Sequence, residues 1–212
     1  MVKSLPQLLH KDLSNEEIKA IATTTINTDY RLHFKIYTDG SKYAESTSAA
    51  MWIPCLQVED KWKLAQGEYR SIMGAELFAI NQALHWLLLN QPLILNEEVV
   101  ILSDSKSGIM ALENHQKRSY SSLSNQILSL ANILKDSVAS LTIQRVPSHV
   151  GLVGNEKADE LAKDAHRLTW LTEAPLDPME MKVKLKTTLK RRCQLKYDLA
   201  KQTTFIGCIK DS

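Results

Sequence analysis

The sequence predicts a mixed α/β fold in which helices flank a single sheet. Strand-like alternation begins at His33 and is followed by two more strand-like runs with short connections, which favours an antiparallel meander. Beyond Glu76 a helical period takes over, and further apolar strands at 99–102 and 141–146 alternate with helical segments. Strands first, then strands alternating with helices, predict a mixed sheet with an antiparallel edge.

The first 32 residues are predicted to be a linker that contains one short helix. Ser14 and Glu17 have the spacing of a capping box, and a polar, threonine-rich stretch runs from there to Asp29. This segment has neither an apolar signal core nor an Arg-rich transit pattern, and no run of about 18 apolar residues occurs in the chain. We therefore expect an intracellular protein of the nucleus or cytoplasm that does not span a membrane.

Residues 33–167 are predicted to form the folded domain. Its first strand alternates at Phe34 and Ile36 and stops at the turn 38–41. The next elements are expected in this order: strands at 48–57 and 62–69 around a charged turn at 58–61, then a helix from Glu76 to Pro92. The later elements are expected to be a strand at 99–102, a helix through Ile109, a helix at 122–135, a strand at 141–146, a loop at 147–154 and a helix at 155–166.

Residues 168–212 are predicted to form a basic helical tail after Pro175 and Pro178. The overall charge is +2, but residues 166–212 carry ten Lys/Arg against five Asp/Glu. Such a run is consistent with a solvated helix face or with contacts to nucleic-acid phosphates. The candidates for phosphate contact are Lys182, Lys184, Lys186, Lys190, Arg191 and Arg192.

Four acidic residues stand where they would be costly in a core. Asp39 and Asp104 each follow an apolar strand, and the carboxyl ends of parallel neighbours meet at the edge of a sheet where ligands bind. Glu76 falls on the apolar face of its helix, and Asp159 borders the apolar stripe of another. Clustered carboxylates repel one another, and hard cations such as Mg²⁺ prefer oxygen ligands. The four acids therefore predict a metal site.

Each acid also has a simpler structural interpretation. Asp39 before a glycine is typical of a turn, and Asp104 before a serine is typical of a helix cap. A different helix phase would expose Glu76, and Asp159 could face water beside Lys163. Together, however, the four acids favour a shared site.

His149 lies in a glycine-bearing loop ten residues before Asp159. An imidazole with a pKa near 6.5 can relay protons at neutral pH, so His149 is a further candidate for the site. The other histidines are expected to be structural.

Five motifs occur in the order of a known family: Tyr37-Thr38-Asp39-Gly40-Ser41, Gly74-Ala75-Glu76-Leu77, Leu102-Ser103-Asp104-Ser105, Pro147-Ser148-His149-Val150-Gly151 and Gly154-Asn155-Glu156-Lys157-Ala158-Asp159-Glu160-Leu161-Ala162. This ordered set resembles the type 1 ribonuclease H family, and most of all the ribonuclease H domains of non-LTR retrotransposon polyproteins. The resemblance covers Phe34 to Ala165.

The resemblance implies a five-stranded mixed sheet and hydrolysis of the RNA strand of an RNA/DNA hybrid with two Mg²⁺ ions, with Mn²⁺ as a possible substitute. It implies that Asp39, Glu76, Asp104 and Asp159 bind the metals and that His149 assists product release or proton transfer. It also implies a parent reverse transcriptase polyprotein. The expected nucleic-acid contacts are Gly40, Ser41, Lys42, Ser105, Lys106 and Asn155.

The sequence also departs from the family. Ile72 and Met73 stand where cellular enzymes often carry hybrid-contacting amides, Lys106 replaces a glutamine, and the basic handle of bacterial members is missing. These departures predict weak hybrid binding by the domain alone and argue against a free-standing cellular enzyme. The alternative function is a catalytically silent fold that binds nucleic acid or protein.

Overall fold

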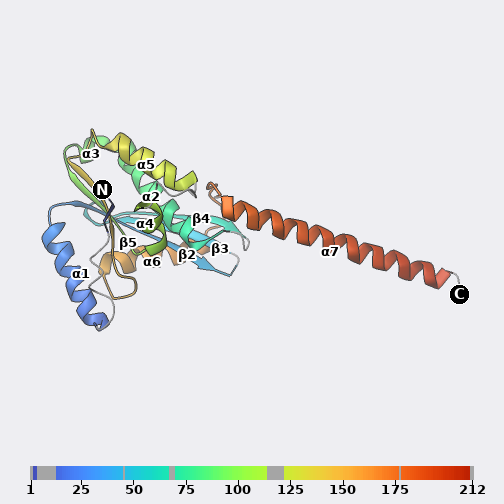
Figure 1. Cartoon of the computed structure of the whole chain (residues 1–212). Coiled ribbons are helices and arrows are strands. Elements are labelled where there is room, and N and C mark those ends of the chain that lie inside the picture. Colours follow the sequence, from blue (N-terminus) through green and yellow to red (C-terminus); the bar gives the residue numbers. More distant parts are fainter. Residues whose placement is uncertain are drawn as a thin grey trace.

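The computed structural model describes residues 2–3, 13–44, 46–66, 70–113, 122–176 and 178–210. Over these residues a single mixed sheet runs in the order β1-β6-β5-β2-β3-β4 (Figure 1). The strands β2 (Phe34–Tyr43), β3 (Ser46–Ile53) and β4 (Val58–Gln66) are antiparallel, whereas β5 (Glu98–Ser103) and β6 (Ser140–Arg145) continue the sheet in parallel from β2. The predicted five-stranded α/β architecture is confirmed. A short additional strand, β1 (Val2–Lys3), pairs in parallel with β6.

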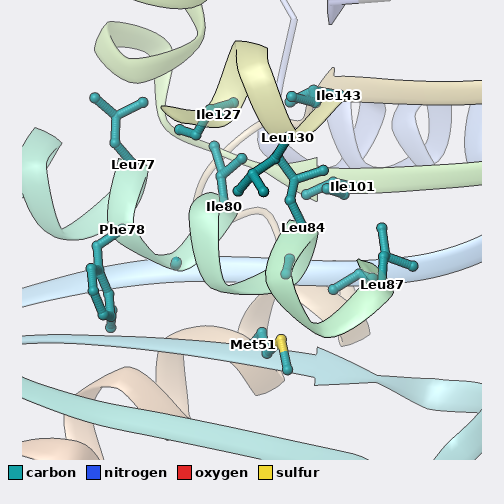
Figure 2. Close-up of a cluster of buried hydrophobic side chains, with 14 of the residues drawn as sticks. Met51, Leu77, Phe78, Ile80, Leu84, Leu87, Ile101, Ile127, Leu130 and Ile143 are labelled. Atoms are coloured by element: carbon teal, nitrogen blue, oxygen red, sulfur yellow. The ribbon is translucent and has the colours of Figure 1, made fainter. Parts of the chain in front are cut away.

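The larger core lies between the sheet and the helices α2 (Ile72–Leu89), α4 (Lys106–Glu113) and α5 (Ser122–Leu134). Figure 2 shows side chains of α2 between α5 and the strands, with Leu84 close to Ile101 and Leu130. The short helix α3 (Gln91–Ile94) follows α2, and Ile94 closes this core. Only α2, among the helices of the described ranges, is long and apolar enough to cross a bilayer, and more than half of it is buried as a core helix.

The opposite face of the sheet is covered by α1 (Asn15–Asp29) and α6 (Val153–Asp164). Because side chains alternate along a strand, Ile36 joins the larger core while its neighbour Tyr37 packs under α6. The ring of Tyr37 lies so close to Gly154 that a Cβ there would be 2.2 Å from it. The absence of a side chain at residue 154 therefore lets α6 sit directly on the sheet.

The capping box at the start of α1 is present, but the expected linker after it is wrong. Ser14 accepts a hydrogen bond from the Glu17 amide, and Glu17 accepts one from the Ser14 amide. The threonine-rich stretch continues as helix to Asp29 because Ala22 and Ile26 are buried against the sheet. The division of the chain into segments 1–32, 33–167 and 168–212 stays a prediction.

Two boundaries differ from the predicted strands. The connection between β3 and β4 is the 3₁₀ turn η2 (Pro54–Leu56), closed by Gln57 in the left-handed region at φ 53°, and the charged stretch expected to turn is the beginning of β4. Proline has no N–H for the sheet, which ends β3. The strand β2 runs on to Tyr43, so Asp39 lies within it and not at its end. The expected end of the third strand at residue 69 lies outside the described residues.

After the 3₁₀ turn η3 (Ala165–Arg167), the basic tail forms one 33-residue helix, α7 (Pro178–Lys210). It begins close to α2 and extends away from the sheet as a rod (Figure 1).

Candidate active site

Three of the predicted acids meet at the carboxyl edge of the parallel strands. The last paired residues of β2 and β5 are Thr38 and Ser103, so the residues that follow them, Asp39 and Asp104, are neighbours across the sheet. Glu76 comes from the second turn of α2. One carboxylate oxygen from each of the three acids lies within 4.8 Å of the other two.

Gly40 brings α2 close enough for Glu76 to reach this cluster. A Cβ at residue 40 would lie 2.6 Å from the Glu76 amide nitrogen and 2.9 Å from the carbonyl carbon of Ala75. Atoms cannot approach this closely without displacing the backbone. The glycine of the Asp39-Gly40 pair is therefore a packing requirement for the site, which a turn interpretation of the pair does not account for.

Ser105 holds the Glu76 side chain and caps a helix with the same hydroxyl. Its Oγ donates a hydrogen bond to Glu76 Oε2 and accepts one of 3.0 Å from the Gly108 amide in the first turn of α4. Asp104, directly before it, thus lies at a fixed helix start.

Asn155 performs the corresponding role for Asp104. Its Nδ2 donates to Asp104 Oδ2 at 3.1 Å, and its side chain is 1% exposed. The bond joins α6 to the end of β5, so Asp104 is oriented by a residue 51 positions later in the chain.

Burial and the proximity of the carboxyl groups in the cluster disfavour their ionisation. Burial, followed by the nearby Asp104 carboxylate, raises the pKa of Asp39 to about 8, although the Gly40 amide, which donates to Asp39 at 2.8 Å, opposes the shift. Burial also raises the pKa of Glu76; the Ser105 hydrogen bond opposes this rise, and Asp104 adds to it. A cation among these oxygens would relieve both penalties.

Asp159 lies beside the cluster but outside its innermost group. Its charge contributes to the raised pKa of Asp39, which places the two carboxylates within electrostatic range. Its Oδ2 accepts a 2.5 Å hydrogen bond from Lys163 Nζ one turn later on α6. Both the ligand interpretation and the interpretation that pairs it with Lys163 thus have a structural basis, and its role as a metal ligand stays a prediction.

His149 approaches the site from its loop together with an acid that the sequence analysis did not select. His149, Glu156 and Asp159 each have a ligand atom within 4.8 Å of the others, and His149 adopts a left-handed φ of 53°. Glu156 Oε1 accepts from the Gly151 amide at 3.0 Å, which ties the loop to α6. The spacing of three between Glu156 and Asp159 on one helix could have indicated it.

Comparison with known proteins agrees with this geometry. Residues 32–167 match the RNase H family. This chain belongs to that family. It is a ribonuclease H by fold and sequence and hence a hydrolase.

Solved ribonucleases H have related structures at low sequence identity. LC11-RNase H1, isolated from compost by a metagenomic approach, is 21% identical with a TM-score of 0.51, and the match covers 64% of this chain and 96% of that one. The same protein in complex with an RNA/DNA hybrid matches at 19% identity and TM-score 0.47, over 63% of this chain and 96% of that one. RNase H1 from Halobacterium salinarum NRC-1 matches at 18% identity and a TM-score of 0.46, over 63% of this chain and 96% of that one. No curated protein matches the sequence significantly.

The donor set of this ribonuclease H fits a hard divalent cation. The central group, Asp39, Glu76 and Asp104, offers carboxylate oxygens alone, and two of these carboxylates have raised pKa values in the metal-free protein. Oxygen donors favour Mg²⁺ or Mn²⁺ over softer metals.

Two of the expected nucleic-acid contacts, Ser105 and Asn155, also contact the acid cluster. Ser105 and Asn155 are each 1% exposed; the Ser105 hydroxyl donates to Glu76 and Asn155 Nδ2 donates to Asp104, whereas the buried Asn155 Oδ1 has no hydrogen-bond partner. Both side chains position the acids, and a contact of either with nucleic acid stays a prediction.

The other four expected contacts stay predictions. Lys106 is exposed at the start of α4, and Gly40 packs against the backbone of α2. Lys42 Nζ donates to the Arg70 carbonyl at 2.8 Å, which connects β2 to the segment before α2.

His166, expected to be structural, holds the hairpin formed by β2 and β3. Its Nε2 lies 3.1 Å from the hydroxyls of both Ser41 and Ser48, and its Nδ1 lies 2.8 Å from that of Ser46. Ser41 is two residues from Asp39, so this network fixes the strand next to the acid cluster. The contact is 125 residues distant in sequence, and no local pattern signals it.

Proposed function

We propose that this ribonuclease H cleaves the RNA strand of RNA/DNA hybrids with two bound Mg²⁺ ions, for which Mn²⁺ could substitute. The observation that carries the proposal is the group of Asp39, Glu76 and Asp104, brought within 4.8 Å by three different elements. Membership of the family and the ordered motifs support the choice of substrate.

In this proposal Asp39, Glu76 and Asp104 hold the metal ions, and Asp159 completes the set. Bound divalent cations supply an activated water and stabilise the leaving oxygen of an in-line displacement. The chain's own contribution is orientation: Ser105 fixes Glu76, and Asn155 fixes Asp104.

His149 and Lys163 are proposed to handle protons and charge at the rim. His149 is exposed on its loop beside Asp159, where an imidazole can exchange a proton with solvent. Lys163 neutralises Asp159 in the metal-free protein, and this ion pair must rearrange if Asp159 becomes a ligand.

The test is cleavage of a labelled RNA/DNA hybrid in Mg²⁺ and in EDTA by the wild type, Asp104→Asn and Asp136→Asn. Asp136 is an exposed carboxylate in the turn after α5 and serves as the matched control. We expect hybrid cleavage that needs metal, is absent with single- and double-stranded RNA, and is lost in Asp104→Asn alone. A folded wild type that binds the hybrid without cleaving it would replace the enzyme by the silent binding module.

We further propose that the domain comes from a non-LTR retroelement or a gene derived from one. The motif resemblance supports this origin, as does Ile72, which is 41% exposed at the start of α2 in a position where cellular enzymes often have an amide. On this proposal Ile72→Asn strengthens hybrid binding, because an amide at that position can donate to the duplex. A gel-shift titration measures the change, and nanomolar binding by the wild type at physiological salt would contradict the expected weak grip.

A further inference from the structure

The helix α7 exposes basic side chains interspersed with apolar ones, and its exposed charge is almost entirely positive. At about 1.5 Å per residue, its 33 residues span roughly 50 Å. From Met181 to Lys201 nearly every described side chain is exposed. Asp198 is the only exposed acid on the described part of this helix, against the following exposed basic residues: Lys182, Lys184, Lys186, Lys190, Arg191, Arg192, Lys196 and Lys201.

The helix is anchored to the element that carries Glu76. Glu180, 3% exposed, accepts hydrogen bonds from the Ser71 amide at 2.7 Å and the Ser71 hydroxyl at 2.8 Å, and Ser71 is the N-cap of α2. Arg70, 2% exposed, lies 3.9 Å from Glu180 and donates to the carbonyl oxygens of Ala174 and Pro175 in the preceding segment.

A glycine makes this junction possible. A Cβ at Gly74 would lie 2.4 Å from Glu180 Oε1, so the Glu180 carboxylate occupies the space over the first turn of α2. The start of α7 is therefore fixed at the first turn of α2, within two helical turns of Glu76. Because its first turn is held beside the acid cluster, we refer to the basic helix α7 as an arm that extends from the domain.

The exposed apolar residues of α7 do not form a stripe free of charge, because Arg192 and Lys196 lie on the same side of the helix as the i, i+4 row Met181, Leu185, Leu189 and Tyr197. From Met181 to Lys186 apolar and basic residues alternate one by one, and a period of two distributes both kinds around a helix with 3.6 residues per turn. A partner helix would need an apolar stripe, whereas a phosphate backbone needs positive charge without a preferred face.

We propose that α7 binds the phosphate backbone of the substrate duplex outside the segment held at the active site. The inference rests on the proposed function, which places a nucleic-acid duplex beside the origin of the arm. The basic stretch from Lys182 to Lys201 is about 30 Å long at about 1.5 Å per residue, which matches roughly 9 base pairs at about 3.4 Å each. Binding is through charge, so it is independent of base sequence and steeply dependent on salt.

The test compares the full chain with Lys190→Gln/Arg191→Gln/Arg192→Gln, whose changes all lie on exposed positions of α7. Fluorescence anisotropy in EDTA, where no cleavage occurs, measures affinity for hybrids of about 12 and about 30 base pairs as salt is varied. Neutralising three phosphate contacts lowers the slope of log K against log salt by up to about 3. We expect at least a tenfold loss on the long hybrid and less than a twofold loss on the short one.

A matched control removes three charges elsewhere. Arg31→Gln/Lys35→Gln/Lys135→Gln lies around the amino ends of the parallel strands and should leave the slope unchanged. An unchanged slope in the α7 variant would overturn the inference. So would a wild-type dimer in sedimentation that is broken by Leu185→Ser/Leu189→Ser without any effect on hybrid binding, since α7 would then be a protein contact.

The two proposals fail in different ways. If the wild type cleaves hybrids in Mg²⁺ but the α7 variant keeps the full salt slope, the proposal that α7 binds phosphates is wrong and the proposed hybrid cleavage is supported. If no hybrid is cleaved but the slope falls in the α7 variant, the arm binds nucleic acid and the enzymatic proposal is wrong.

Discussion

Neutralising Asp39 should stabilise the metal-free protein while it abolishes metal binding. Asp39 is 6% exposed, and its pKa is about 8 instead of the usual value near 3.8. A carboxyl with a raised folded-state pKa binds more protons folded than unfolded, so its contribution to stability is full below pH 3.8 and is lost as the pH rises to 8.

The size of the effect follows from the shift. Between pH 3.8 and pH 7 the penalty of about 1.4 kcal/mol per pH unit accumulates to an upper limit of about 4 kcal/mol. Asp39→Asn replaces a carboxyl group that must take up a proton when the protein folds at pH 7, and it keeps an oxygen that can accept from the Gly40 amide. In EDTA we expect the variant to be more stable than the wild type by up to about 4 kcal/mol at pH 7, and by less than about 1 kcal/mol at pH 4.

Urea unfolding in EDTA at both pH values measures the difference, with Asp136→Asn as a control that should change neither. Addition of Mg²⁺ should narrow the difference, because binding at ten times Kd stabilises the wild type by about 1.4 kcal/mol and leaves the variant unaffected; about 1,000 times Kd, worth about 4.1 kcal/mol, is needed to cancel it. The electrostatic account of the cluster would be refuted if the variant were less stable than the wild type at pH 7. It would also be refuted if the difference in free energy of unfolding were the same at pH 4 and pH 7.

Three further outcomes are expected. Gly40→Ala places a methyl group 2.6 Å from the Glu76 amide and should lower kcat/KM on hybrids about a hundredfold by displacing that carboxylate; normal kinetics would refute the packing requirement. Glu180→Gln leaves Arg70 buried beside a neutral partner and should cost roughly 3 kcal/mol in urea unfolding, a loss that the neutral double replacement Arg70→Met/Glu180→Leu should partly restore. Burial, and to a smaller extent Lys63, lowers the pKa of His166, so the hydrogen bonds of the neutral ring stabilise the β2–β3 hairpin above pH 6.5 and are lost on acidification. The amide hydrogens of the hairpin should therefore exchange faster at lower pH, after correction for intrinsic exchange, and His166→Gln should abolish that pH dependence.

Local patterns in the sequence were sufficient for the elements whose burial is uniform or strictly periodic. The run 99–102 is apolar at every position, and the strand it forms is fully buried on both faces. Asp39 and Asp104 could be predicted because each follows a strand at the edge of the sheet where ligands bind, and Glu76 because a charge on an apolar helix face demands an explanation. Ser14 and Glu17 also acted locally, over three residues, and their capping box formed as predicted.

The tertiary structure decided what depends on the approach of distant segments. The stretch before Asp29 reads as a polar linker until the sheet buries Ala22 and Ile26, and packing then favours helix over intrinsic preference. The hydrogen bond of Asn155 to Asp104 joins residues 51 positions apart, and only the tertiary structure reveals it.

The same holds for the contacts that fix the site in place. The contacts of Gly40 in β2 with α2, of His166 with three serines and of Glu180 with Ser71 each join residues far apart in the chain, and none leaves a periodic trace in the sequence. The sequence by itself determines which residues carry charge and along which element they lie. How closely two elements approach, and hence which carboxylates share a cation and which hydroxyls hold them, is set by packing across the whole domain.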